Sequence, residues 1–142
     1  MSLRRKLLLA IPLALLVVVG GCKVDTINYF PPHPAQVRVI NLMPEPASLD
    51  VQIGGSPAFS AVPFQSLTGY ESYENRTTSF SVAVTGSTTP LLTFNYPLAG
   101  EQPYTLVLMG TLTNPSATLL AEVANAPTNG NIQLSVFNAA IN

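Results

Sequence analysis

The 142-residue chain is poor in the residues that most often carry chemistry. It has no tryptophan, one cysteine and one histidine, and only 9% of its residues are charged. A single cysteine excludes a disulfide framework and a cysteine-rich metal site. The net charge of −1 gives no electrostatic reason to expect a nucleic-acid partner. The length suits one ordinary domain and is short for two.

The first 21 residues have the organisation of a signal peptide. A cationic start at residues 4–6 precedes the apolar run Leu7–Val19. That run is shorter than the ~20 residues that a membrane-spanning helix needs. Small residues then lead, through Gly21, to the only cysteine, Cys22. We therefore leave residues 1–21 out of the fold prediction.

The tetrad Val19-Gly20-Gly21-Cys22 resembles the lipobox of bacterial lipoproteins. In such proteins the cysteine thiol receives a diacylglycerol, the chain is cut just before it, and the new amine is acylated. Two or more acyl chains, such as palmitate, anchor a protein stably, whereas one chain is marginal. We predict cleavage between Gly21 and Cys22 and lipidation of Cys22, the alternative being an ordinary signal peptide with a chance cysteine. Lys23 follows in place of Asp, which by resemblance to Gram-negative sorting favours the outer membrane and a place in the cell envelope.

Two further regions follow the signal peptide. Residues 22–34 combine the lipidated cysteine with a proline-rich tether, stiff enough to hold a domain roughly 35–40 Å from the bilayer. Residues 35–142 are predicted to form one domain that is a monomer. From residue 22 onward three cationic residues stand against seven acids, a net charge of −4. This balance suits neither nucleic acid nor an anionic membrane surface.

Apolar and polar residues alternate through most of the chain after Pro34, which is the pattern of β-strands with one buried face. Gly54-Gly55 is typical of a tight turn, and Val107 with Met109 makes both faces of one strand apolar, as in a central strand. Seven or eight strands predict an all-β sandwich, with a barrel as the less favoured alternative. The predicted strands lie at Gln36–Leu42, Leu49–Ile53, Tyr70–Tyr73, Phe80–Val84, Leu92–Leu98, Tyr104–Leu108, Leu119–Val123 and Ile132–Val136.

Several motifs resemble one family of bacterial and archaeal surface modules. They are VRVIN at residues 37–41, LDV at 49–51, Phe64, Gly69-Tyr70, and LAGxxxYTLVLxG at 98–110. Together, over Ala35 to Val123, they resemble the family catalogued as domain of unknown function 4397. The resemblance implies an immunoglobulin-like antiparallel sandwich on secreted or anchored proteins, often in tandem copies, and implies no activity. The turn Glu74–Thr78 departs from the family pattern.

The residue types that could catalyse are scattered. His33 lies between prolines in the tether, which supplies no positioning shell for a general base. Gly54-Gly55 precedes no helix, so it does not fit a phosphate loop. We predict no enzyme activity, no metal and no cofactor. The acidic residues show neither the pairing of a glycosidase nor the clustered run of a calcium site. The scattered carboxylates are Glu45, Asp50, Glu71, Glu74, Glu101 and Glu122.

Two functions remain open from the sequence. The favoured one is a non-enzymatic, lipid-anchored envelope module with a structural or protein-interaction role. Its partners are the membrane, through the lipid on Cys22, and an unknown envelope protein. The alternative is a ligand-binding module for glycan or peptide that uses loop aromatics. Tyr70, Tyr73 and Tyr104 are the candidate stacking residues, although aromatics at strand spacing are more often core or sheet-surface residues.

The C-terminus repeats the beginning of the domain. Gln133–Asn138 reads QLSVFN and echoes QVRVIN at Gln36–Asn41. One interpretation is a relic of a truncated repeat. The other, which we favour, is a strand that closes the domain and buries Ile132, Leu134 and Val136, because an exposed apolar strand invites aggregation. Deleting residues 131–142 would then unfold the domain or make it insoluble.

Overall fold

The computed structural model describes residues 33–122, 127–134 and 136–138. Gly21, Cys22 and Val123 therefore lie outside the described residues, as does the signal peptide. Within the described part, no helix is long and apolar enough to cross a bilayer. The strands are β1 (Ala35–Asn41), β2 (Ser48–Ile53), β3 (Ser56–Pro63), β4 (Glu71–Tyr73), β5 (Thr77–Val84), β6 (Pro90–Pro97), β7 (Pro103–Gly110) and β8 (Pro115–Ala121).

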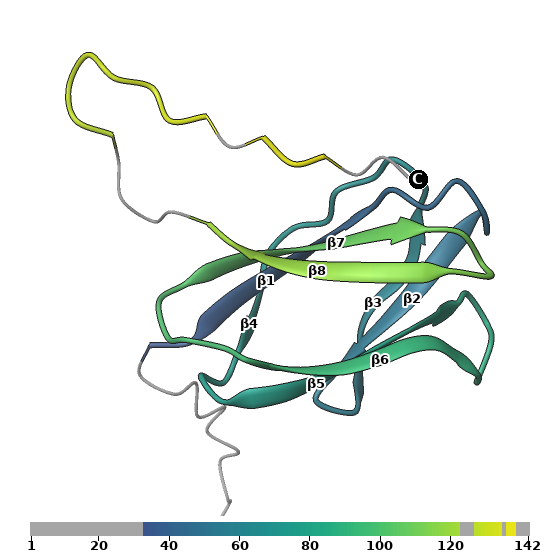
Figure 1. Cartoon of the computed structure of the whole chain (residues 1–142). Coiled ribbons are helices and arrows are strands. Elements are labelled where there is room, and N and C mark those ends of the chain that lie inside the picture. Colours follow the sequence, from purple (N-terminus) through teal and green to yellow (C-terminus); the bar gives the residue numbers. More distant parts are fainter. Residues whose placement is uncertain (1–32, 123–126, 135, 139–142) are drawn as a thin grey trace, which may run out of the picture.

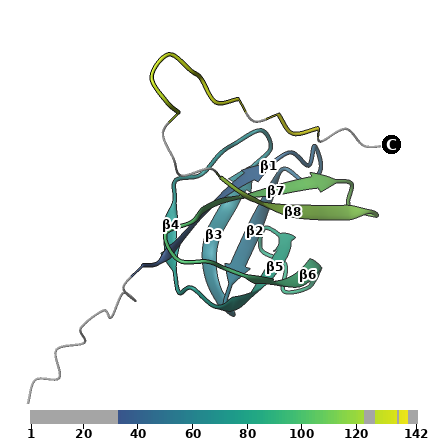
Figure 2. The ribbon, with the colours of Figure 1, turned by 60° about the vertical axis from the view of Figure 1, so that its left-hand side comes forward.

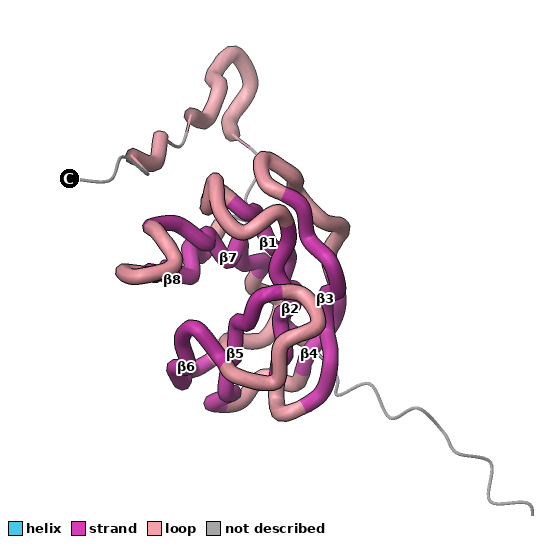
Figure 3. The backbone as a smooth tube through the Cα atoms, turned by 90° about the vertical axis from the view of Figure 1, so that its right-hand side faces the viewer, coloured by secondary structure: helices cyan, strands magenta, loops and turns pink. Residues whose placement is uncertain are grey.

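The eight strands form two four-stranded sheets that pack face to face. Sheet A has the order β4-β1-β7-β8, and sheet B has the order β3-β2-β5-β6. Figure 1 shows sheet A above sheet B, and Figure 3 shows the two layers from another side. The predicted all-β sandwich is confirmed. The predicted central strand is also confirmed, because β7 lies between β1 and β8.

One pair of strands departs from the predicted antiparallel arrangement. β1 and β7 run parallel, with Val37 opposite Tyr104 and Asn41 opposite Leu108, whereas the other strand pairs are antiparallel. Parallel neighbours need a long crossover, because a short turn can only reverse the chain. Here the crossover is most of the domain: the chain leaves β1, builds β4 and all of sheet B, and returns as β7 (Figure 2).

The hairpin of β2 and β3 confirms the predicted turn and adds a strand that the sequence analysis missed. Gly54 and Gly55 both have positive φ, 64° and 81°, as a two-residue turn of type I′ requires. β3 escaped prediction because it has a proline near each end, Pro57 and Pro63, and because its register shifts against β2. At this irregularity Ala61 has a φ of 51°, and its N–H donates to Asp50 Oδ1 at 2.7 Å.

A single apolar core fills the space between the sheets. Phe80 is fully buried and stacks on Phe94 with 5.0 Å between ring centroids. From sheet A the core takes alternate residues of β1 and β7, so the intervening residues of these strands face outward. The buried core residues are Ala35, Val37, Val39, Met43, Leu49, Val51, Ile53, Phe59, Val62, Phe80, Val82, Leu98, Tyr104, Leu106, Leu108 and Leu119.

Asn41 is the buried polar residue that connects the two sheets. It ends β1, is completely buried, and donates from Nδ2 to the carbonyl of Val62 in β3 at 3.0 Å. Its Oδ1 accepts from the N–H of Met43 at 2.9 Å. Because both polar ends of the amide are satisfied, this asparagine fixes the exit of β1 without a desolvation penalty.

The predicted closing strand at the C-terminus is wrong. Residues 131–134 and 136–138 form no strand, and Ile132, Leu134 and Val136 are 93%, 80% and 85% exposed. The last strand described is β8, which ends at Ala121, so these residues join neither sheet as a strand. The described C-terminal residues lie instead beyond the outer face of sheet A, on the side away from sheet B (Figures 1 and 3).

Candidate functional site

A hollow with a volume of about 540 Å³ lies on the outer face of sheet A. We call it the outer groove. Strands β1, β7 and β8 supply its floor, and two residues of the C-terminal segment stand on its rim. The floor is apolar in the middle and polar at one end. Its lining residues are Arg38, Ile40, Leu42, Thr105, Val107, Leu120, Ala121, Glu122, Gln133 and Phe137.

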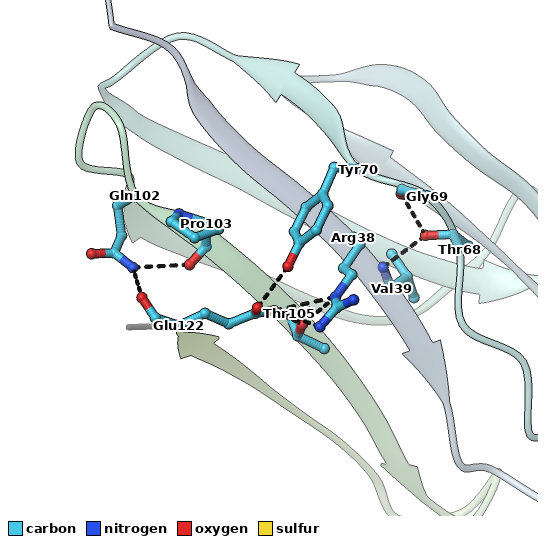
Figure 4. A network of polar contacts seen from close by, with 9 residues as sticks. All are labelled: Arg38, Val39, Thr68, Gly69, Tyr70, Gln102, Pro103, Thr105 and Glu122. Carbon is cyan, nitrogen blue, oxygen red and sulfur yellow. Dashed lines mark hydrogen bonds and ion pairs between the residues drawn. The ribbon is translucent and has the colours of Figure 1, made fainter. Parts of the chain in front are cut away.

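The polar end of the outer groove is built around Arg38 and Glu122. Arg38 Nη2 lies 2.9 Å from Glu122 Oε1, and its Nε donates to Thr105 Oγ1 at 2.8 Å. The Thr105 hydroxyl also donates to Glu122, and the hydroxyl of Tyr70 donates to Glu122 Oε2 at 2.6 Å. Figure 4 shows Arg38, Thr105 and Tyr70, from three separate parts of the chain, converging on the Glu122 carboxylate.

Register explains why these residues meet. Arg38 pairs with Thr105 across the parallel β1–β7 ladder, so their side chains emerge side by side on the outer face. Glu122 directly follows β8, and its N–H donates to the carbonyl of Pro103 at 2.8 Å. Gln102 also donates to the Glu122 carbonyl. These contacts hold the Glu122 side chain over the start of β7.

Hydrogen bonds and charge set the protonation of this cluster. Burial raises the pKa of Glu122, but donation from Thr105 and Tyr70 and the charge of Arg38 outweigh it, so the pKa lies below its usual range. Burial and the nearby Glu122 carboxylate raise the pKa of Tyr70 to about 12. At neutral pH the cluster therefore holds one cation and one anion, which balance.

Tyr70 also covers the guanidinium group of Arg38. The Arg38 Cζ lies 4.7 Å from the Tyr70 ring centroid, which is cation–π geometry. Tyr70 remains 40% exposed. One face of this ring is therefore committed to Arg38, and the other borders the solvent next to the outer groove.

The three tyrosines proposed as a stacking platform lie in different places. Tyr104 is a core residue, 3% exposed, and its hydroxyl accepts from the N–H of Ala99 at 3.0 Å. Tyr73 packs against the core edge, where burial and the adjacent Glu71 raise the pKa of its phenol well above the usual range. Tyr70 alone of the three lies on the outer face of sheet A. The structure does not bring them together as a platform.

The tether histidine has a contact that the sequence did not indicate. His33 Nδ1 lies against the Glu101 carboxylate in the turn before β7, and the two side chains are 63% and 71% exposed. Gly100 allows the close approach, because a Cβ at this position would lie 2.5 Å from the His33 carbonyl oxygen. The contact fastens the start of β1 to the turn at residues 100–101.

Two further acidic residues are engaged in structural contacts. Asp50 accepts from the N–H groups of Ala61 and Gly86, which with the Thr85 hydroxyl hold its pKa below the usual range despite some burial. Glu74 pairs with Arg76 at 3.0 Å. Among the residues the structure describes, no group of three or more histidine, cysteine or acidic side chains could hold a metal ion.

Sequence reasoning named Glu122 only as one of several scattered acids and did not single out Arg38 or Thr105. A signal was available for Arg38: it is one of three cationic residues after Gly21, and it sits between two core-facing valines. Thr105 and Glu122 carried no such signal. Thr105 and Glu122 lie 67 and 84 positions after Arg38 in the sequence. They meet Arg38 only because β1 and β7 pair in parallel.

The fold and the groove together define a two-sheet β-sandwich with a partly apolar outer face on one sheet. The model of the family described as "Domain of unknown function (DUF4397)" matches residues 35–142. The chain belongs to this family, as its motifs suggested. No curated protein matches the chain significantly.

A solved structure with a related arrangement is the C-terminal domain of AlgF from P. aeruginosa. The two chains are 20% identical and superpose with a TM-score of 0.47. The match covers 63% of this chain and 99% of that one.

Proposed function

We propose that this protein is a lipid-anchored, non-enzymatic module of the bacterial cell envelope that binds another envelope protein through the outer groove. The observation that carries the proposal is the groove itself: an apolar sheet face bordered by a neutral Arg38–Glu122 pair. A sheet face that only meets water is usually polar, whereas a face that meets a protein combines an apolar centre with a polar rim.

The anchor rests on the sequence around Cys22. The lipobox supplies the cysteine that takes the lipid, and cleavage after Gly21 frees its amine for acylation. The proline-rich residues up to Pro34 then separate the sandwich from the bilayer. Lys23 in the position after the cysteine favours the outer membrane. In this arrangement the lipid holds the protein at the membrane, and the sandwich presents the binding face.

The absence of catalysis is supported by what the polar groups already do. Glu122 accepts from three side chains, and Asp50 accepts from two backbone N–H groups and a threonine. A general base needs a lone pair directed at substrate, and a nucleophile needs an adjacent base. The acids with depressed pKa values here serve as hydrogen-bond acceptors within the fold.

The anchor is tested by replacing the cysteine. Cys22→Ala should leave the precursor uncleaved by the lipoprotein peptidase and should abolish incorporation of labelled palmitate. The matched control is the variant Lys23→Ala, which keeps Cys22 and should still be lipidated. Normal maturation and labelling of Cys22→Ala would reject the lipid anchor.

The binding face is tested by site-specific photo-crosslinking in cells. A crosslinking amino acid at Leu42, on the groove floor, should give one adduct of defined mass. The same amino acid at Gln52, exposed on sheet B, should give none. Adducts from both positions, or from neither, would contradict a partner at the outer groove. A glycan array should give no signal, and reproducible binding there would favour a carbohydrate ligand.

A further inference from the structure

The floor of the outer groove is more apolar than a solvent-facing sheet surface requires. Val107 is 3% exposed, although it stands between two core residues of β7 and so points away from the core. Ile40 and Leu120 are half-buried beside it. These side chains make a continuous apolar strip across β1, β7 and β8.

Part of this strip is already covered by a peptide segment of the same chain. Gln133 and Phe137, four residues apart, line the outer groove from above. The residues between and before them, Ile132, Leu134 and Val136, are exposed. The described parts of residues 131–138 therefore present alternate residues to the groove and to solvent, as an extended peptide does.

The cover is incomplete. Phe137 remains 40% exposed, and the volume of about 540 Å³ is the space left while the segment is in place. Pockets that bind ligands commonly have volumes of ~300–1,000 Å³. The outer groove therefore has room for side chains beyond the one aromatic ring that its own chain supplies.

Charge indicates what kind of peptide fits. Among the residues that the structure describes, the charged ones that line the groove are Arg38 and Glu122, which pair with each other. Residues 127–138 contain no charged residue at all. An acidic or basic partner would meet no unpaired opposite charge among these lining residues, whereas an uncharged segment has no charged side chain to desolvate.

We propose that the outer groove binds an extended, uncharged peptide segment of an envelope partner, with an aromatic side chain in the place of Phe137. The described residues 131–134 and 136–138 of this chain, through Gln133 and Phe137, are its displaceable cover. The proposal rests on the proposed function and specifies its partner. The partner segment replaces Phe137 on the floor formed by Ile40, Val107 and Leu120, and its remaining side chains fill the space that the cover leaves open.

Fluorescence anisotropy tests the proposal with a labelled peptide that has the sequence of residues 131–138, NIQLSVFN. The protein is the full mature chain. Phe137→Ser should bind the peptide at least tenfold more tightly than the wild type, because the variant no longer covers the groove. Leu134→Ser is the matched control, since Leu134 is exposed in the same segment, and its affinity should equal that of the wild type. A peptide with serine in place of its phenylalanine should not bind.

A second substitution locates the bound peptide. Leu120→Arg, added to Phe137→Ser, should abolish binding, and Leu42→Arg serves the same purpose if that variant melts early by circular dichroism. Equal affinity of wild type and Phe137→Ser, or binding that survives both floor substitutions, would overturn the proposal. A wild-type dimer in sedimentation that Phe137→Ser dissociates would also overturn it and would assign the groove to a second copy. Loss of peptide binding with the Leu42 crosslink intact would leave the proposed function standing.

Discussion

Strand β1 and the C-terminal segment at residues 133–138 carry nearly the same sequence pattern in opposite environments. The first reads QVRVIN and the second QLSVFN. Val39 of β1 is completely buried, whereas Val136 at the equivalent position is 85% exposed. Val37 and Leu134 show the same contrast, at 0% and 80%. Two segments with one pattern thus reach two different structural states.

The difference teaches that an alternating pattern specifies a face and not a partner. β1 is buried because β7 pairs with it over six residues and β4 covers its other edge. Both partners come from distant parts of the chain, and their pairing is decided by the whole sandwich. The described residues 133–134 and 136–138 have the same pattern but lie in no strand and pair with neither sheet.

The largest effect expected within this comparison is at Asn41, the residue that ends β1. Asn41→Ala removes the hydrogen bond to the Val62 carbonyl and deprives the buried Met43 N–H of its acceptor. A buried polar group left unsatisfied costs ~1–3 kcal/mol, and a cavity adds to this, so we expect a loss of about 3 kcal/mol. Urea denaturation measures it. Asn95→Ala, exposed in β6, is the control and should change stability by less than ~0.5 kcal/mol.

The matched valines give the next largest effect. Val39→Ala removes two buried methyl groups and leaves a cavity, so the free energy of unfolding should fall by about 2 kcal/mol. Val136→Ala, at the equivalent position of the C-terminal segment, should change it by less than ~0.5 kcal/mol. Denaturation midpoints of the two variants decide the matter. Equal losses would mean that residues 133–138 are buried in solution and that the two segments are alike.

The fold class was predictable because local information decides it. Strict alternation gave most of the strands, and Gly54-Gly55 gave the first hairpin. The predictions failed where the alternating pattern does not specify which strands pair. β3 was missed because prolines and small residues blur its alternation, and the strand at Ile132–Val136 was wrongly added because its alternation is clear. The parallel pairing of β1 with β7 has no local signature at all.

The outer groove was not predictable for the same reason. Its polar end joins Arg38, Thr105 and Glu122, and only the tertiary register places them together. Tyr70 was singled out for stacking on sugars, and the structure shows it stacked on Arg38. The alternation of β1 predicts that Arg38 and Ile40 face away from the core. It does not predict that Gln133 and Phe137 line the same groove.

The two segments differ at one polar position, where β1 has Arg38 and the C-terminal segment has serine. Replacing Arg38 should lower the free energy of unfolding by a smaller amount, which depends on pH. Arg38→Ser removes the ion pair with Glu122 and the hydrogen bond to Thr105. Since the pair is partly exposed, we expect a loss of about 1 kcal/mol at pH 7. Arg76→Ser, which breaks an exposed pair with Glu74, should cost less than ~0.5 kcal/mol.

The pH dependence of the Arg38→Ser effect follows from the lowered pKa of Glu122. A carboxylate with a lowered pKa in the folded state stabilises the protein above its unfolded pKa, and this contribution is lost as the pH falls through the folded value. The gap between wild type and Arg38→Ser should therefore shrink below the ordinary glutamate pKa of 4.5. Melting temperatures between pH 7 and pH 3 test this. A gap that stays constant between pH 7 and pH 3 would show that Arg38 acts by packing alone.

The smallest effect is expected from removing the C-terminal segment altogether. Among the described residues, deleting 131–142 takes away none that belongs to the core, since the buried core residues end at Leu119. It uncovers part of the apolar strip beneath Phe137, so a change of about 1 kcal/mol or less is expected. This reverses the outcome expected from the pattern alone, in which the deletion unfolds the domain. Circular dichroism and a melting curve of the deletion variant, beside those of Val39→Ala, make the measurement. If the deletion destabilises the protein more than Val39→Ala does, residues 133–138 pair as a strand after all, and the contrast between the two segments fails.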